Sequence, residues 1–139
     1  VYATPRSKFA DPHVSVGLVA GDGGCVIWPQ LIGFARAKKY LLTGEMIKAG
    51  DALSMGLIAE VIEEDKIDQE VQALAEKLRD GAKYSIRWTK TSINAGLKVM
   101  ANSIIDRAAA FENVTQLMED HKIALEAFAK KETPKFKQK

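Results

Sequence analysis

The segment FADPHVSVGLVAGDGG, residues 9–24, contains the residue types that proton-transfer chemistry needs. His13 stands in its first half and Asp22 near its end, within an otherwise apolar and glycine-rich run. Histidine titrates close to neutral pH, and a carboxylate on one ring nitrogen fixes its tautomer and direction. Glycines at positions 17, 21, 23 and 24 make it easy for the segment to fold back. His13 and Asp22 are therefore a candidate pair for general acid–base catalysis.

A purely structural interpretation of the same two residues is also open. Asp22 can cap the first turn of a following helix, and His13 can be a polar residue that begins a strand after Pro12. The pattern by itself favours this interpretation. His121 lies within EDHK on a charged helical face, and we expect it not to be catalytic. The two histidines lack metal-ligand spacing, so no metal site is predicted.

Composition argues against several classes of protein. Of 139 residues, 47% are hydrophobic and 27% are charged, which is ordinary for a soluble globular chain. No apolar run approaches the roughly 18 residues of a membrane helix, and the first residues lack a signal-peptide pattern. A net charge of +2 gives no reason to expect nucleic acid as a partner. The single cysteine, Cys25, rules out an internal disulfide and favours a reducing, cytoplasmic setting.

Short extended segments and helices alternate in the first half of the chain. VYA at the start resembles the end of a strand, and HVSVGLVAG, residues 13–21, is predicted to be a buried strand. A short helix is expected after Asp22. Further helices are predicted over 34–43 and 48–55, each closed by a glycine, and LIAEVIEE, residues 57–64, is predicted to be a strand.

The second half is predicted to be helical. Apolar residues recur there at spacings of three and four, which places each group on one face of a helix. Such stripes run over 67–78, 86–100, 104–118 and 123–128, so four helices are expected. These apolar faces lack an obvious partner layer, and the first half has too few strands for a stable sheet. Both observations favour oligomerisation or a further portion of chain upstream.

Several of these segments together resemble a known family. The frame consists of FADPHVSVGLVAGDGG, the helix ending in LLTGE, the pattern IKAGDALSMGL followed by EV, and the final EDHKIALEAFAKKETPKF. It is similar to the second half of the crotonase superfamily, the enoyl-CoA hydratases and isomerases. The resemblance implies an α/β fold. Residues 1–62 would form the C-terminal part of a β-β-α spiral core, and residues 63–139 a helical region for trimerisation and CoA contact.

The resemblance also implies parts that these residues do not supply. Family members are considerably longer, and their first half provides the backbone N–H groups of the oxyanion hole and one catalytic carboxylate. None of these motifs occurs in this sequence. An N-terminal half is therefore expected upstream or as a separate chain. A homotrimer, or a dimer of such trimers, is the expected assembly.

The implied function is the addition of water across the double bond of a 2-enoyl-CoA thioester in fatty acid metabolism. Acyl-CoA would be the substrate, with no other cofactor. Typical hydratases carry a glutamate where this chain has His13. A subgroup with similar DPHV and GDGG segments carries both the histidine and the aspartate, and it includes a β-diketone hydrolase whose His–Asp pair is implicated in activating water. The resemblance thus implies that His13 is the general base or acid and that Asp22 orients it.

Two alternatives to a hydratase stay open. The first is a hydrolase of the same fold that cleaves a carbon–carbon bond of a β-diketone with the same pair. The second is a non-catalytic fragment whose helices serve oligomerisation only.

The C-terminal tail KKETPKFKQK is rich in lysine and carries Glu132 as its one acidic residue. It can be a solvated terminus or a site for an anionic ligand. Phe128 and Lys131 match a Phe–x–x–Lys element near the end of family members. The resemblance implies that Phe128 packs on the adenine ring of CoA bound to a neighbouring subunit, and that Lys131 meets phosphate oxygens.

Overall fold

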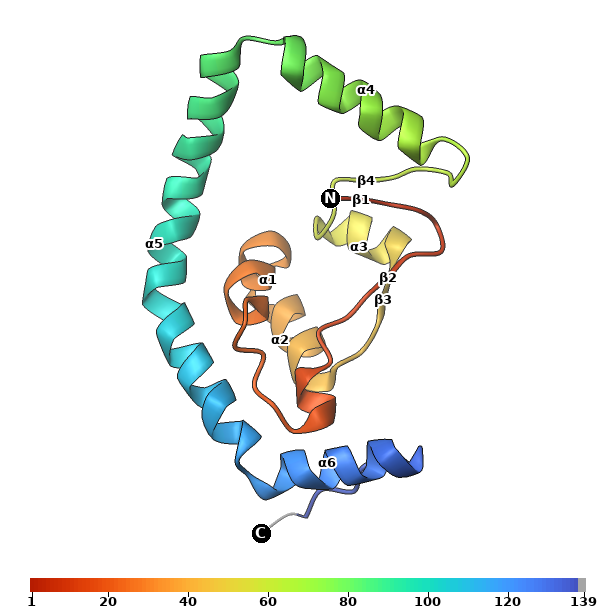
Figure 1. The fold of residues 1–139 in the computed structure, drawn as a ribbon, viewed down its shortest axis with the longest axis vertical. Helices are drawn as coiled ribbons and strands as arrows, with labels where there is room; N and C mark the ends of the chain where they lie inside the picture. The colour runs from red at the N-terminus through yellow and green to blue at the C-terminus, as the bar shows by residue number, and fades with distance from the viewer. Residues whose placement is uncertain (138–139) are drawn as a thin grey trace. The chain divides into compact units, whose positions relative to one another are not determined.

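The computed structural model describes residues 1–137 (Figure 1). Lys139 of the basic tail lies outside the described residues. The chain divides into two compact units, the first from Val1–Phe9 with Ile47–Asn102, the second from Ala10–Met46 with the residues from Ser103 onward. The division predicted from the resemblance, at residue 62, stays a prediction. No helix within residues 1–137 combines the length and the apolar character that crossing a bilayer requires.

The first unit contains two short pairs of strands. Strand β1, Tyr2–Ala3, pairs in parallel with β4, Glu60–Val61, and β2, Lys8–Phe9, pairs antiparallel with β3, Ile47–Lys48 (Figure 1). The strands predicted at VYA and within 57–64 are therefore confirmed, although each is only two residues long. Strands β1 and β4 supply each other's hydrogen-bonding partners.

Helix α3, Ala49–Met55, contacts β2, β3 and β4 and completes the core of the first unit. It ends at Gly56, whose φ of 83° is the left-handed conformation predicted for a closing glycine. The core consists of small and aliphatic side chains. The buried ones are Ala3, Ile47, Ala49, Ala52, Leu57 and Ile58.

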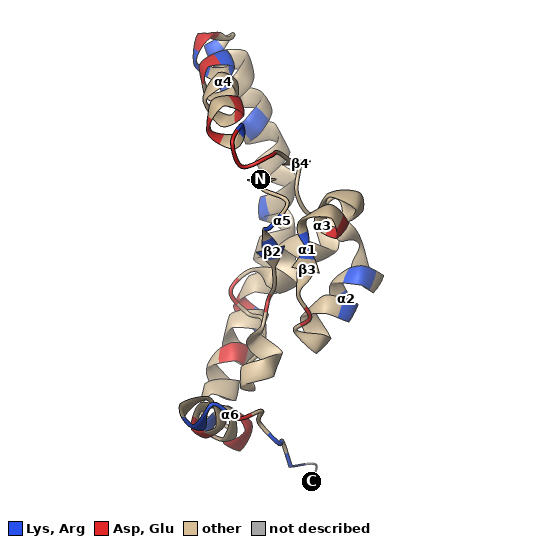
Figure 2. Cartoon of the chain, turned by 90° about the vertical axis from the view of Figure 1, so that its right-hand side faces the viewer, with Lys and Arg blue, Asp and Glu red and all other residues tan. Residues whose placement is uncertain are grey.

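Helix α4, Ile67–Asp80, confirms the helix predicted from the stripe over 67–78, and Gly81 follows it. No residue of α4 is buried, and acidic and basic residues lie along its length (Figure 2). Val71, Leu74 and Leu78 are 37–49% exposed. The predicted apolar stripe is thus present on α4, but its side chains are exposed to solvent in this chain.

Helix α5 runs without a break from Lys83 to Gln116, 34 residues in all. The prediction of separate helices over 86–100 and 104–118 was wrong. The residues between the two stripes, Ala101 to Ser103, include neither proline nor glycine, so nothing in the backbone interrupts the hydrogen-bonded ladder.

The second unit is helical. It contains a 3₁₀ turn η1, His13–Val16, and helices α1, Gly24–Ile32, α2, Phe34–Thr43, and α6, Glu119–Lys130. Helices α1 and α2 pack on each other, and η1 contacts α2 and α6. The side chains buried in this unit are Asp11, Ala20, Val26, Ile32, Ala37, Leu41, Ala108, Ala124 and Ala127.

The strand predicted over residues 13–21 was wrong, because this segment turns back at once. The N–H of Ser15 donates to the carbonyl of Pro12, and the N–H of Gly17 donates to the carbonyl of Val14. Gly17 closes the turn with a φ of 70°. The β-branched residues favoured a strand, but none of the described strands lies beside this segment to pair with it.

Helix α6 is fixed against η1 by two close contacts. Nδ1 of His121 lies 2.8 Å from the carbonyl oxygen of Val16, to which it donates. A Cβ at Gly17 would lie 2.7 Å from the backbone carbon of Asp120 and the backbone nitrogen of His121. His121 therefore has a structural partner, and Gly17 is needed because no side chain fits there.

Replacement of Gly17 by alanine is expected to destabilise the protein by roughly 1–3 kcal/mol, since it adds backbone strain at positive φ and overlap with α6. Chemical denaturation of the purified protein measures the change. Gly96→Ala is the matched control, because a Cβ at Gly96 meets nothing within 4 Å and the residue is helical. The control is expected to be neutral or about 0.5–1 kcal/mol more stable. Equal stability of both variants would contradict the packing described for Gly17.

Candidate active site

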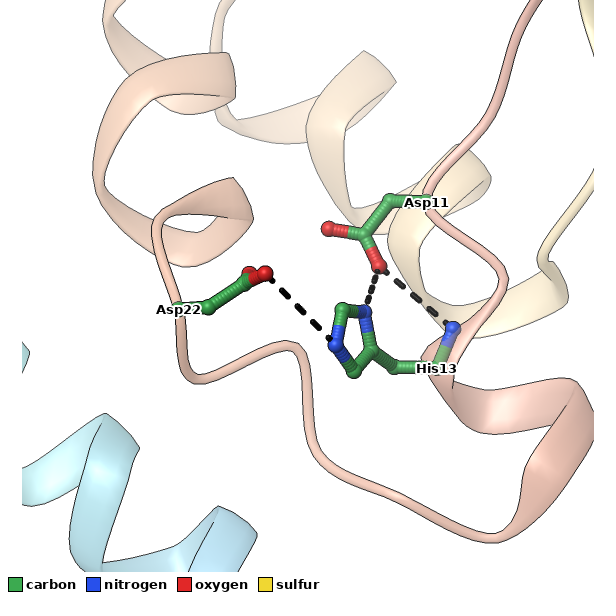
Figure 3. A group of neighbouring side chains, drawn as sticks. All are labelled: Asp11, His13 and Asp22. Carbon is green, nitrogen blue, oxygen red and sulfur yellow. Dashed lines mark hydrogen bonds and ion pairs between the residues drawn. The ribbon is translucent and has the colours of Figure 1, made fainter.

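His13 is the centre of a cluster of charged groups in the second unit. Its ring lies between the carboxylates of Asp11 and Asp22 (Figure 3). Nδ1 is 2.6 Å from Oδ1 of Asp11. Nε2 is 3.8 Å from Oδ2 of Asp22 and 3.9 Å from Oε1 of Glu112. The structure thus brings His13 and Asp22 together, and it adds two carboxylates that sequence reasoning missed.

Asp11 precedes His13 by two residues and is buried, with 8% of its surface exposed. Its Oδ1 accepts the short hydrogen bond from the ring and also lies 3.5 Å from the backbone nitrogen of His13. An aspartate that reaches the backbone two residues further along is a recognised turn signal, and Asp-Pro-His carries it. Reading the segment as a strand hid this signal.

Gly24 gives the Asp11 carboxylate its space. A Cβ at Gly24 would overlap Oδ2 of Asp11 and would lie 3.1 Å from both Cγ of Asp11 and a methyl carbon of Leu41. The start of α1 therefore approaches Asp11 with no room for a methyl group. The glycine was noted in the sequence for backbone freedom, but its use here is close approach.

Asp22 lies in the turn before α1, and its side chain is 66% exposed. Helix α1 begins after Gly23, and no side chain donates or accepts a capping hydrogen bond there. The structural interpretation of Asp22 as a helix cap was therefore wrong. Its distance from Nε2 exceeds a hydrogen bond, so in this structure it acts on His13 through its charge.

Glu112 reaches His13 from helix α5, and its side chain is 20% exposed. Gly21 makes this approach possible, because a Cβ there would lie 2.5 Å from the carbonyl oxygen of Ala108 and 2.6 Å from Oε2 of Glu112. The N–H of Val19 also donates to Oγ1 of Thr115, at 3.2 Å. Glu112 is far from His13 in sequence, so no local spacing could have indicated it.

The charges around His13 favour its protonated form. Partial burial lowers the pKa of the imidazole, but the hydrogen bond to Asp11 and the charges of Asp11, Asp22 and Glu112 outweigh it. The pKa of His13 is therefore raised above its ordinary value of 6.5. Burial, with the charges of Asp11 and Asp22, likewise raises the pKa of the Cys25 thiol. A thiol kept protonated is a poor nucleophile, which supports a structural role for Cys25.

The same side chains satisfy the distances of a possible cation site. Asp11, His13 and Asp22 each bring one donor atom within 4.8 Å of the others. The 2.6 Å separation between Nδ1 and Asp11 is, however, a hydrogen-bond distance, so that pair shares a proton.

An apolar cavity of about 220 Å³ lies in the same unit. Cys25, three residues after Asp22, is one of its lining residues. The other lining residues are Val19, Ser103, Ile104, Arg107, Ala108 and Phe111. This lining is mainly apolar, and it does not include His13 or the three carboxylates that surround its ring.

Phe128 and Lys131 lie at the C-terminal end of α6. The ring of Phe128 is 80% exposed. Lys131 closes the helix in the left-handed conformation, with a φ of 57°, and its N–H donates to the carbonyl of Phe128. Both side chains are free to meet a ligand, and their role in binding CoA stays a prediction.

Comparison with known proteins relates the whole chain to one family. The family model described as enoyl-CoA hydratase/isomerase matches residues 1–139. A short-chain-enoyl-CoA hydratase of Clostridioides difficile is 36% identical over 104 residues, which cover 75% of this chain and 67% of that protein. The chain spans about half the length of other curated relatives, 49% and 52% in two of them.

Solved structures give the same result. An enoyl-CoA hydratase/isomerase from Pseudoalteromonas atlantica T6c matches 99% of this chain and 55% of its own, with a TM-score of 0.91 and 28% identity. A β-diketone hydrolase from the cyanobacterium Anabaena sp. PCC 7120 matches 87% of this chain and 47% of its own, with a TM-score of 0.78 and 27% identity. The fold class predicted from the resemblance, the C-terminal part of a crotonase-like α/β protein, is confirmed. The chain belongs to the enoyl-CoA hydratase/isomerase family.

Proposed function

We propose that the protein containing this chain adds water across the double bond of a 2-enoyl-CoA thioester, with His13 as the general base. The observation that carries the proposal is a half-buried imidazole whose Nε2 faces two carboxylates and makes no hydrogen bond to any residue within 1–137. Membership of the family, and relatives that are short-chain-enoyl-CoA hydratases, support acyl-CoA as the substrate.

The geometry suits a stepwise transfer of one proton. Neutral Nε2 removes a proton from water while the water oxygen bonds to C3 of the enoyl thioester. The electron pair of the double bond moves toward the thioester oxygen, and C2 then receives a proton from the imidazolium. Asp22 and Glu112 stabilise the imidazolium while it holds the proton. We propose that donors to the thioester oxygen come from outside these residues, as the resemblance implies.

We propose that the apolar cavity of the second unit receives the acyl group of the substrate, since Cys25 of its lining lies three residues from Asp22. Its lining is aliphatic and aromatic except for Cys25, Ser103 and Arg107. A hollow of about 220 Å³ suits a short acyl chain.

We further propose that the protein works in the cytoplasm, in fatty acid metabolism. Its lone unpaired cysteine supports the cytoplasmic location.

A hydrolase of β-diketones is the second candidate function. It is favoured by the similarity to the β-diketone hydrolase of Anabaena and by the histidine at the position where typical hydratases carry glutamate. Turnover of crotonyl-CoA without turnover of a cyclic β-diketone supports the hydratase. The reverse result supports the hydrolase.

His13→Ala in the full-length protein is expected to lower kcat for crotonyl-CoA by roughly 10²–10⁴-fold, because the proton acceptor is removed. Asp22→Asn is expected to cause a smaller loss, since Asp22 acts through charge at 3.8 Å. The absorbance of the enoyl thioester measures both. Asp68→Asn on exposed α4 controls for the loss of a carboxylate. Turnover close to wild type in both site variants would contradict the proposed role of the pair.

The pH dependence of kcat/KM has a definite direction. A base must be unprotonated, and the pKa of His13 is raised. The rate is therefore expected to fall as the pH decreases through a value above 6.5. Asp22→Asn removes a charge that raises this pKa, so its acidic limb is expected to move to lower pH. An unmoved limb would show that Asp22 does not act on His13.

We also propose that Phe128 and Lys131 bind the CoA portion of the substrate. Lys131→Gly is a sharp test, because glycine suits the φ of 57° while the charge is lost. It is expected to raise KM for crotonyl-CoA by roughly 3–10-fold at unchanged kcat, which corresponds to about 0.7–1.4 kcal/mol of lost binding. Lys130→Ala, in the last turn of α6, is the neighbouring control. An equal effect of both variants would point to general charge and not to a contact of Lys131.

A homotrimer or a dimer of trimers is the proposed assembly. Large apolar side chains that are at least half exposed on α5 support an interface on that helix. These are Tyr84, Trp88, Ile93, Val99, Phe111 and Val114. Sedimentation equilibrium is expected to give three or six protomers. A stable trimer that fails to bind acyl-CoA would favour the non-catalytic oligomerisation unit, and a monomer would contradict the assembly.

A further inference from the structure

We propose that Asp11 is the residue that orients His13, holding the ring proton on Nδ1 and leaving Nε2 free for the reaction. Asp22, the orienting residue expected from the sequence, then belongs with Glu112 on the reacting side of the ring. The inference deepens the proposed function, because it concerns the same histidine.

The distances separate the two sides of the imidazole. Asp11 approaches Nδ1 to 2.6 Å, whereas Asp22 and Glu112 stand 3.8 Å and 3.9 Å from Nε2. An ionised carboxylate has no hydrogen to donate, so the hydrogen in the short contact is carried by Nδ1. A neutral His13 therefore carries its proton on Nδ1 and a lone pair on Nε2, since the partner of one nitrogen decides the state of the other.

Burial makes Asp11 the more rigid of the candidate partners. It is 8% exposed, and Pro12 limits the backbone rotation between it and His13. The start of α1 closes over its Oδ2 at Gly24. By contrast, the side chain of Asp22 is 66% exposed. A carboxylate fixed on several sides can hold a ring in one direction, and an exposed one in a turn cannot do so as well.

The surroundings of Nε2 are consistent with its being the unprotonated nitrogen. The gap of almost 4 Å between Nε2 and each facing carboxylate is longer than a hydrogen bond. If Asp11 were absent, these two carboxylates would be the nearest acceptors and would draw the ring proton to Nε2. The ring would then be a donor where the reaction needs an acceptor. Asp11 prevents this reversal.

Nuclear magnetic resonance of protein labelled with ¹⁵N-histidine tests the tautomer directly, at a pH well above the pKa of His13. The wild type is expected to show His13 protonated at Nδ1. Asp11→Ala is expected to reverse it to Nε2, and Asp22→Ala to leave it unchanged. His13→Asn assigns the signals, and unchanged His121 signals show that α6 still contacts η1. Protonation at Nε2 in the wild type, or an unchanged tautomer in Asp11→Ala, would overturn the inference.

Asp11→Asn keeps the shape of the side chain, so it tests whether Asp11 orients His13 even where Asp11→Ala fails to fold. Its titration is expected to show a larger fall in the pKa of His13 than Asp22→Asn gives, and an equal or smaller fall would overturn the inference. Turnover is a separate readout, with a loss of roughly 10²–10⁴-fold expected for Asp11→Ala at little changed KM. A reversed tautomer in Asp11→Ala, together with full activity of His13→Ala, would support the inference and reject the proposed function.

Discussion

The hydrogen bond between Asp11 and His13 is the closest contact of the site, and the packing of the second unit brings two further carboxylates to the same ring. Three carboxylates within 4 Å of one ring repel one another, and the imidazole that lies among them offsets part of this repulsion when it is protonated. The chain holds this arrangement by turning sharply at η1 and by fixing that turn against α6. Packing therefore holds one imidazole close to three carboxylates, and the raised pKa of His13 follows from their charges and from the hydrogen bond to Asp11.

The local part of this site could be predicted from the sequence, and the long-range part could not. His13 and Asp22 share one segment, so flexible glycines between them were enough to indicate a pair. Asp11 stands beside them but was passed over, because β-branched residues after Pro12 favoured a strand. Glu112 meets the ring through the tertiary packing of α5, which no local spacing reveals.

The same distinction applies to the fold. Helix ends marked by glycine, such as Gly44 and Gly56, were placed correctly because the left-handed backbone is a local property. The continuity of α5 was missed because the change of apolar stripe near residue 102 was taken as an interruption. That change coincides with the boundary between the two compact units, so it marks where the helix passes from one unit into the other and not where it ends.

Gly21 and Gly24 show how absent atoms can set a site's dimensions. Each position excludes a methyl group because a carboxylate, or the helix that carries it, occupies the space. During divergence Gly24 should therefore be tied to Asp11, whose carboxylate is the main obstacle to a side chain there. In descendants that lose Asp11, Gly24 becomes open to replacement, whereas Gly21 stays barred by the carbonyl oxygen of Ala108 even where Glu112 is lost. Evolutionary covariation between positions 11 and 24 would then be a record of the chemistry that the site has kept.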